Sequence, residues 1–256
     1  MCTHGALVAA WYGSTDIAAG ARVMVPLIKE LRAAFPDREV TAAITSPRVR
    51  DIIARRDPGD RPAVASAYID DVLDAVGERD ATESGCAVLP LLIAEGPQMT
   101  RLREVCGRRG IRVGGPLIAD RDDAVRVARA ICGRYPARAG RVVLFVGHGS
   151  GTTGDDAYRW VAEAASAMGR TDVRVCLMGD DPDPTLPTGC DVLLVPLMLV
   201  AGTHMAREIA GAGEGSLRSR LSAMGYQADA VFEGIGELPD IQELAVDHTR
   251  ALLGLD

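Results

Sequence analysis

The sequence has few of the residue types that recognise nucleic acids. Only 4% of its 256 residues are aromatic, and Lys29 is its single lysine, so nearly all basic side chains are arginine. The formal net charge is −7. Scarce aromatic rings argue against base stacking, and an acidic chain without a basic run does not attract a phosphate backbone. We therefore expect no nucleic-acid partner.

Long apolar runs and paired cysteines are also missing. The longest apolar run lies near 192–201, contains Pro196 and is too short to span a bilayer. The first residues lead directly into a strand-like run without a basic leader, so we expect no signal peptide. Six cysteines are scattered without a CxxC pair, which is typical of reduced thiols. These absences predict a cytoplasmic protein that does not bind a membrane.

Short apolar runs alternate with amphipathic segments along the chain. The strand candidates are Ala6–Trp11, Val40–Ile44, Cys86–Ile93, Ile111–Val113, Arg141–Val146, Val173–Met178, Asp191–Leu199 and Ala228–Phe232. The helix candidates are Ile17–Phe35, Pro62–Val76, Thr100–Arg109, Asp122–Arg134, Asp155–Met168, Leu217–Met224 and Ile241–Leu253. This alternation, with strands that are apolar on both faces, predicts an α/β fold of parallel sheets flanked by helices.

The chain also repeats itself. Three pairs of segments match in the same order: ALVAAWYGS (Ala6–Ser14) with VVLFVGHGS (Val142–Ser150), PLLIAEG (Pro90–Gly96) with PLMLVAG (Pro196–Gly202), and LREVCGRRGI (Leu102–Ile111) with LRSRLSAMGY (Leu217–Tyr226). Ordered internal matches indicate two related α/β halves. A Pro/Gly/Arg-containing stretch at 135–140 precedes the second copy, so we expect the halves to span residues 1–137 and 138–256.

Histidines stand at two matched places of this repeat. His148 follows the first strand of the second half and matches Tyr12, and His204 follows a later strand and matches Gln98. Ligands of open parallel sheets bind at the carboxyl ends of the strands, where Met178 also lies. Neutral imidazole binds divalent metals and accepts protons near neutral pH. The pattern therefore predicts a metal or acid–base site in the second half.

These segments resemble a known family. VVLFVGHGS, PLMLVAGTH and the tail FEGIGELPDIQELAVDH (Phe232–His248) are similar to the anaerobic cobalt chelatases, the class II sirohydrochlorin cobaltochelatases. The tail carries that family's GxGExPxI pattern. ITSPRVRDIIARRD (Ile44–Asp57) resembles its T-S-x-x-[IV]-R…RD segment. The resemblance covers nearly the whole chain.

The resemblance implies a chelatase-like fold of two halves with an active-site cleft between them. It implies insertion of cobalt(II) into sirohydrochlorin, without ATP or another nucleotide, in anaerobic cobalamin biosynthesis. The family's two catalytic, metal-binding histidines match His148 and His204. Its usual glutamate ligand falls at or beside Met178, which gives a candidate thioether ligand. In the first half, Leu92 and Gln98 replace the histidine and glutamate of the family's LHxxxGxEY segment.

These replacements leave alternatives open. A softer site without the carboxylate suits nickel as well as cobalt, and iron is a further candidate. The reaction can also run as metal removal, or the frame can serve as a tetrapyrrole or metal carrier without turnover. Turnover above the uncatalysed rate distinguishes an enzyme from a carrier.

The tetrapyrrole partner, sirohydrochlorin or a similar compound, carries many carboxylates that an acidic protein must neutralise locally. Arg207 is the candidate cation, and backbone N–H groups of the serine turns are candidate donors. The full set of candidate substrate contacts is Tyr12, Gly13, Ser14, Ser46, Leu92, Gln98, Ser150 and Arg207. A homo-oligomer is compatible with the sequence.

Overall fold

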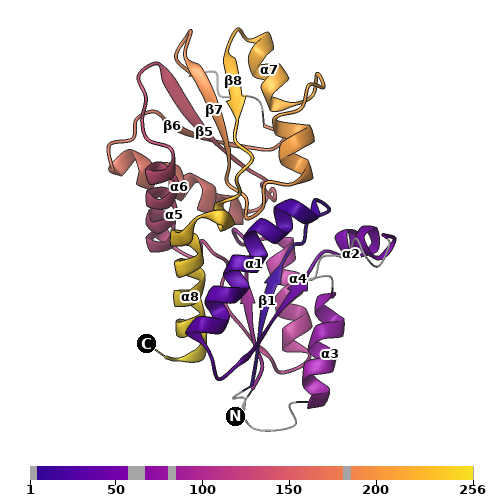
Figure 1. Ribbon diagram of the computed structural model, residues 1–256. Helices are drawn as coiled ribbons and strands as arrows, with labels where there is room; N and C mark the ends of the chain where they lie inside the picture. The colour runs from indigo at the N-terminus through magenta and orange to yellow at the C-terminus, as the bar shows by residue number, and fades with distance from the viewer. Residues whose placement is uncertain (1–4, 57–66, 80–84, 181–185, 256) are drawn as a thin grey trace. The chain divides into compact units, whose positions relative to one another are not determined.

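The computed structural model describes residues 5–56, 67–79, 85–180 and 186–255. The chain divides into two compact α/β units (Figure 1). The first unit runs up to Leu117 and includes the residues from Gln242 onward, and the second spans Ile118–Ile241.

The first unit is built on a parallel sheet with the strand order β2-β1-β3-β4. Its elements are β1 (Ala6–Trp11), α1 (Ile17–Ala34), β2 (Glu39–Ile44), α2 (Pro47–Ala54), α3 (Ile69–Arg79), β3 (Ala87–Pro90), α4 (Pro97–Gly107), β4 (Arg112–Val113) and α8 (Pro239–Leu253), which begins at the border of the units. One face of the sheet packs its apolar side chains against α3 and α4.

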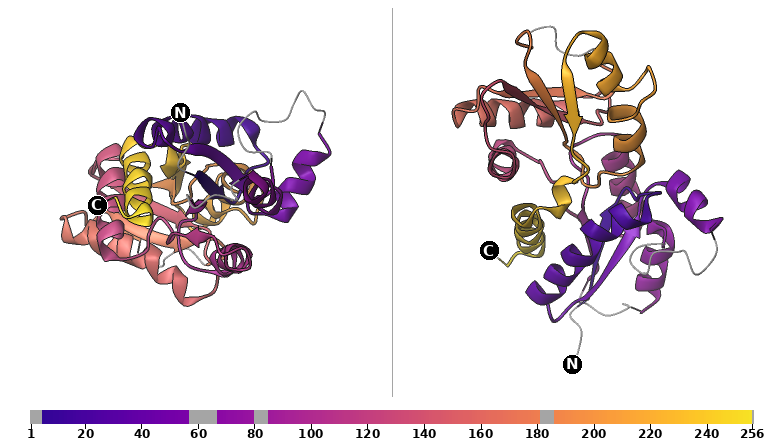
Figure 2. Two further views of the ribbon diagram at one scale, coloured as in Figure 1. Left: turned by 90° about the horizontal axis from the view of Figure 1, so that it is seen from below. Right: turned by 45° about the horizontal axis from the view of Figure 1, so that its top comes forward.

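The second unit has a parallel sheet with the equivalent order β6-β5-β7-β8. Its elements are α5 (Arg121–Arg134), β5 (Arg141–Gly147), η2 (Thr153–Asp155), α6 (Asp156–Ala167), β6 (Val173–Leu177), β7 (Asp191–Pro196), the π-helical turn η3 (Met205–Ile209), α7 (Leu217–Ala223), β8 (Gln227–Ala230) and η4 (Ile235–Glu237). In the right-hand view of Figure 2, α5 and α6 lie on one side of this sheet, and η3 and α7 lie on the other.

The duplication is confirmed by strand order and register. Ala10 of β1 pairs with Pro90 of β3, as Val146 of β5 pairs with Pro196 of β7. The hydrogen bonds of the next residues match too. Leu91 N donates to Ala10 O at 2.7 Å, and the equivalent hydrogen bond to Val146 O is 2.8 Å long. This register puts Tyr12 and His148 at equivalent positions, two residues beyond the paired strand residues.

The eight predicted strands all form, with small differences at their ends. The predicted helix over Pro62–Val76 begins at Ile69 in the structure, and residues 62–66 lie outside the described part of the chain. Sequence analysis missed α2, a short helix that Ser46 caps by accepting from Val49 N at 3.3 Å. No helix within the described ranges is long and apolar enough to cross a membrane.

The border between the compact units differs from the expected boundary after residue 137. Helix α5 packs against α6 and therefore belongs to the second unit. Arg170 stabilises this arrangement, because its guanidinium donates to the carbonyls of Cys132 and Tyr135 at the end of α5. Conversely, α8 returns to the first unit, where Arg112 donates to Leu252 O. Each repeated strand pair nevertheless stays within one unit.

Candidate active site

The turn after β5 presents His148 at the carboxyl edge of the second sheet. Gly149 has φ +73°, a backbone conformation that favours glycine. Gly147 must also lack a side chain, because a Cβ there would lie 2.5 Å from the ring of Tyr158. Burial raises the pKa of Tyr158 to about 12, so the phenol behind the turn stays neutral.

A buried carboxylate stabilises the loop that follows His148. Asp155 accepts from Ser150 N at 2.8 Å, from Ser150 Oγ at 2.9 Å and from Gly151 N at 2.8 Å. These charge-assisted bonds hold the glycine-rich loop in one conformation. The loop therefore gives His148 a fixed backbone position, although its side chain is exposed.

His204 lies at the start of η3 after the Gly202 turn. The π-helical turn is closed by a bond from Ala210 N to Met205 O at 2.9 Å. The Leu199 turn before His204 rests on the GIGE segment, in which Gly236 N donates to Leu199 O at 3.0 Å. A Cβ on Gly234 would lie 2.4 Å from Leu199 O, so this packing requires glycine. The tail motif thus supports the turn that carries His204.

The structure brings the two histidines together. Their ring centroids are 5.1 Å apart, and the ring planes cross at 89°. A metal ion about 2 Å from an imidazole nitrogen lies about 3 Å from the ring centre, so two rings that share one ion are at most about 6 Å apart. The pair is therefore close enough to hold one metal ion.

In both rings Nδ1 contacts an oxygen of the protein. His148 Nδ1 lies 2.9 Å from Gly149 O, and His204 Nδ1 lies 2.7 Å from the Glu208 carboxylate. A carbonyl or a carboxylate accepts, so both Nδ1 atoms act as donors. Within the described residues neither Nε2 has a hydrogen-bond partner, so both are available to bind a metal or accept a proton. In the described part of the chain, no group of three or more His, Cys, Asp or Glu side chains is arranged to hold a metal ion.

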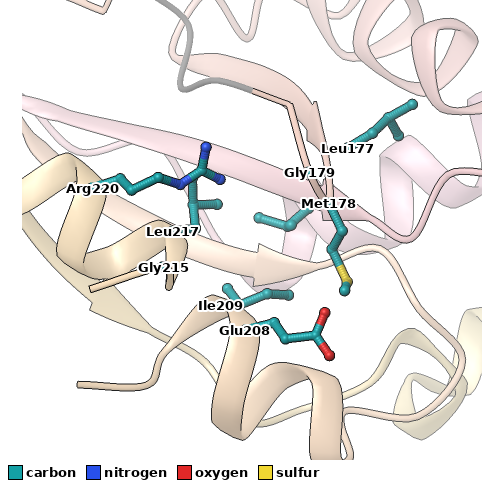
Figure 3. Close-up of a pocket in the computed structure, with 9 residues that line it drawn as sticks. Leu177, Met178, Gly179, Glu208, Ile209, Gly215, Leu217 and Arg220 are labelled. Atoms are coloured by element: carbon teal, nitrogen blue, oxygen red, sulfur yellow. The ribbon is translucent and has the colours of Figure 1, made fainter. Parts of the chain in front are cut away.

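A cavity of about 300 Å³ lies at the end of β6 (Figure 3). Met178 and Glu208 both line it, and the thioether and the carboxylate approach each other there. Arg220 lies at its other side, where it donates to Asp180 O at 2.8 Å. Met178 is half-buried and also packs against the core of the second unit. The expected thioether ligand therefore lines a cavity together with Glu208, and Glu208 in turn contacts the His204 side chain.

The first unit places its candidate substrate contacts differently. Tyr12 is 40% exposed, and Ser14 Oγ accepts from Asp16 N at 3.1 Å. A Cβ on Gly13, at φ +97°, would lie 2.7 Å from Ile44 Cγ2. Leu92 is buried with the side chains under α3 and α4, so its side chain is a core residue.

The expected use of the serine-turn amides needs correction at two positions. Ser46 N donates to Tyr12 O at 3.2 Å, and its hydroxyl caps α2. Ser150 N already donates to Asp155. These amides stabilise the turns and are not free donors for a substrate. Arg207 is exposed on η3, one turn from His204.

Glu208 is the site residue that sequence analysis missed. It stands four positions after His204, a spacing that places two side chains on one face of a helical turn. That spacing was the available signal. The contact depends on η3, which has no equivalent in the described stretch between Gly96 and Leu102: Leu217 lies fifteen positions after Gly202, whereas Leu102 lies six after Gly96.

Each of the two α/β units is built on a parallel sheet, and the second unit carries a pair of imidazoles at the carboxyl edge of its strands. Solved structures agree with this fold: SirB from Bacillus subtilis with Fe3+ matches with a TM-score of 0.63 at 15% identity, over 97% of this chain and 95% of that one. DR2241 from Deinococcus radiodurans, described as a multi-domain protein with structural similarity to chelatases, matches with a TM-score of 0.58 at 17% identity, over 96% of this chain and 55% of that one.

The family model for cobalt chelatase (CbiK) matches residues 5–253, so the chain belongs to the CbiK cobalt chelatase family. It is 29% identical to a sirohydrochlorin cobaltochelatase of Salmonella typhimurium, over 89% of this chain and 88% of that protein. It is 30% identical to the sirohydrochlorin cobaltochelatase CbiKC of Nitratidesulfovibrio vulgaris, over 89% of this chain and 84% of that protein.

Proposed function

We propose that the protein is a sirohydrochlorin cobaltochelatase, an enzyme that inserts cobalt(II) into sirohydrochlorin. The observation that carries the proposal is the pair of free Nε2 atoms on His148 and His204, whose rings lie 5.1 Å apart. Membership of the cobalt chelatase family and the two related cobaltochelatases support the substrate.

The two imidazoles perform two tasks in this reaction. A free-base tetrapyrrole must lose two pyrrole protons when a divalent ion enters. Neutral Nε2 atoms first hold the ion beside the macrocycle and, as it leaves them, accept the protons. Glu208 stabilises the positive charge that forms on His204, because its carboxylate already accepts from Nδ1 at 2.7 Å. Chemistry of this kind needs no nucleotide.

Nickel(II) is the second candidate metal. The supporting observation is Met178, whose thioether lines the cavity beside Glu208. Met178 stands at or beside the position of the family's usual glutamate ligand, so the site lacks that carboxylate. Two neutral imidazoles and a thioether favour softer divalent ions over oxygen-preferring ones. Tyr12, Gly13, Ser14, Gln98 and Arg207 remain the proposed substrate contacts, and a cytoplasmic location suits a reaction on a tetrapyrrole intermediate.

A spectroscopic insertion assay tests this function. Purified protein is mixed with sirohydrochlorin and Co(II), Ni(II) or Fe(II), and the absorbance change gives the insertion rate. We expect His148→Ala and His204→Ala each to lower the rate by about 10²–10⁴-fold, as for a lost acid–base group. His248→Ala, on α8, is the matched histidine control. Stoichiometric binding without a rate above background would instead identify a carrier.

A further inference from the structure

The first unit has its own polar site at the sheet edge that corresponds to the imidazole site. Ala10 and Ala43 pack on the α3/α4 face of the first sheet, so Thr45, two residues beyond Ala43, continues on that face. Thr45 is 3% exposed, and its Oγ1 has no hydrogen-bond partner among the described residues. The buried Oε1 of Gln98 likewise has no hydrogen-bond partner among the described residues. Unpartnered buried polar atoms are costly and point to a missing polar ligand.

Two arginines surround a tyrosine at this edge. The Tyr68 ring is buried with the α3/α4 core, and Tyr68 forms a parallel bridge with Ile44, the residue before Thr45. The guanidinium carbons of Arg50 and Arg101 lie 4.6 Å and 5.9 Å from its ring centroid. Arg101 also donates to the Tyr68 hydroxyl. Contacts of this kind orient both guanidinium groups before any ligand arrives.

The two arginines differ in their counter-ions. Arg50 forms an ion pair with Asp51 at 2.8 Å. Within the described ranges, Arg101 bonds only to the Tyr68 hydroxyl and has no carboxylate partner. Arg103, two residues on along α4, is already paired with Glu95 through both terminal nitrogens. Arg101 therefore has several N–H donors left for an anion, beside a second cation at the same ring.

We propose that Arg101, with Arg50 and Tyr68, forms a carboxylate-binding site for an acidic side chain of the tetrapyrrole. This proposal rests on the proposed function and names how its substrate is recognised. Planar guanidinium groups bind carboxylates through two parallel hydrogen bonds, which gives orientation as well as affinity. The Thr45 hydroxyl adds a buried donor at the same edge. The site supplies positive charge that the chain as a whole, with a net charge of −7, does not.

The test measures binding and turnover separately. Equilibrium binding of metal-free sirohydrochlorin is followed by its fluorescence in wild type, Arg101→Met, Arg101→Lys and Arg50→Met, and insertion of Co(II) is measured with the same proteins. Methionine keeps the apolar stem over the Tyr68 ring but removes the charge. Arg103→Met is the matched control, because it removes a neighbouring guanidinium of α4 that already has its own carboxylate. Thermal unfolding checks that each variant is folded.

We expect Arg101→Met to weaken sirohydrochlorin binding about tenfold or more, as for a lost charge-assisted hydrogen bond, with kcat nearly unchanged. Arg101→Lys should recover part of the loss and Arg103→Met should bind like wild type. Equal binding by Arg101→Met and Arg103→Met overturns the carboxylate site but not the proposed function. Binding that depends on Arg101 but yields no turnover overturns the proposed function but supports the site. A wild-type protein that does not bind sirohydrochlorin overturns both.

Discussion

Glu208 provides the sharpest test of how the imidazole pair works. Its carboxylate lies 2.7 Å from His204 Nδ1, so Nδ1 donates to it and the ring is held with Nε2 available for a ligand. Glu208→Gln keeps an oxygen that accepts from Nδ1 but removes the charge. Glu208→Ala removes both. The order of activity should therefore be wild type, then Gln, then Ala.

The expected loss of affinity and rate in the Glu208 variants depends on how exposed the Glu208 side chain is. Loss of a residue that orients a metal ligand costs about 10–100-fold in affinity or activity. The Glu208 side chain is 54% exposed, so solvent screens its charge and the lower part of this range applies. We expect about tenfold for Glu208→Ala, or about 1.4 kcal/mol, and about threefold for Glu208→Gln.

The assay combines a Co(II) titration of the free protein with the rate of insertion into sirohydrochlorin. Glu214→Gln is the matched control, because Glu214 is an exposed glutamate in the loop that follows η3 and lacks a contact with His204 in the described chain. A lower Co(II) affinity and insertion rate in Glu208→Ala, but not in Glu214→Gln, would support the role of Glu208 in holding the hydrogen on His204 Nδ1. Wild-type Co(II) affinity and rate in Glu208→Ala would refute it, since His204 would then not need its partner.

Three further changes test other parts of the structure. Met178→Glu should raise Co(II) insertion relative to Ni(II), because a carboxylate would then join the His204–Glu208 side of the cavity; an unchanged metal preference in the assay panel would make Met178 a packing residue only. Gly234→Ala should destabilise the fold by about 1–3 kcal/mol in urea unfolding, because its Cβ would lie 2.4 Å from Leu199 O, and should slow insertion; Gly133→Ala, a helical position with open space, is the control that should not destabilise. Arg170→Met should destabilise by about 1.5–3 kcal/mol at pH 7. Since hydrogen bonding from Arg170 lowers the Asp172 pKa, that part of the stability is present above the ordinary value of about 4 and is lost as the pH falls through and below it. The difference in free energy of unfolding between wild type and Arg170→Met should therefore shrink from pH 6 to pH 3. A constant difference would show that only the hydrogen bonds to the α5 carbonyls stabilise the fold.

Much of the architecture could be read from the sequence because its cause is local. Alternation of apolar runs with amphipathic segments predicted the parallel sheets, and ordered internal matches predicted the duplicated strand order. Both signals depend on periodicity and on residues near one another in the chain. The short helix α2 was missed because eight residues give little periodicity, and its start depends on the cap that Ser46 provides.

The sequence by itself also determined that His148 and His204 each follow a strand, at places that Tyr12 and Gln98 occupy in the first half. Because parallel strands end at one edge, it also predicted that the two histidines lie close together. Only the tertiary structure decided which imidazole nitrogen is free, since that depends on the partners of Nδ1, the Gly149 carbonyl and the Glu208 carboxylate. It also decided that the Ser46 and Ser150 amides are already bonded within the chain. Hydrogen-bond partners are selected by distance in space, and a linear pattern of residue types does not contain that distance.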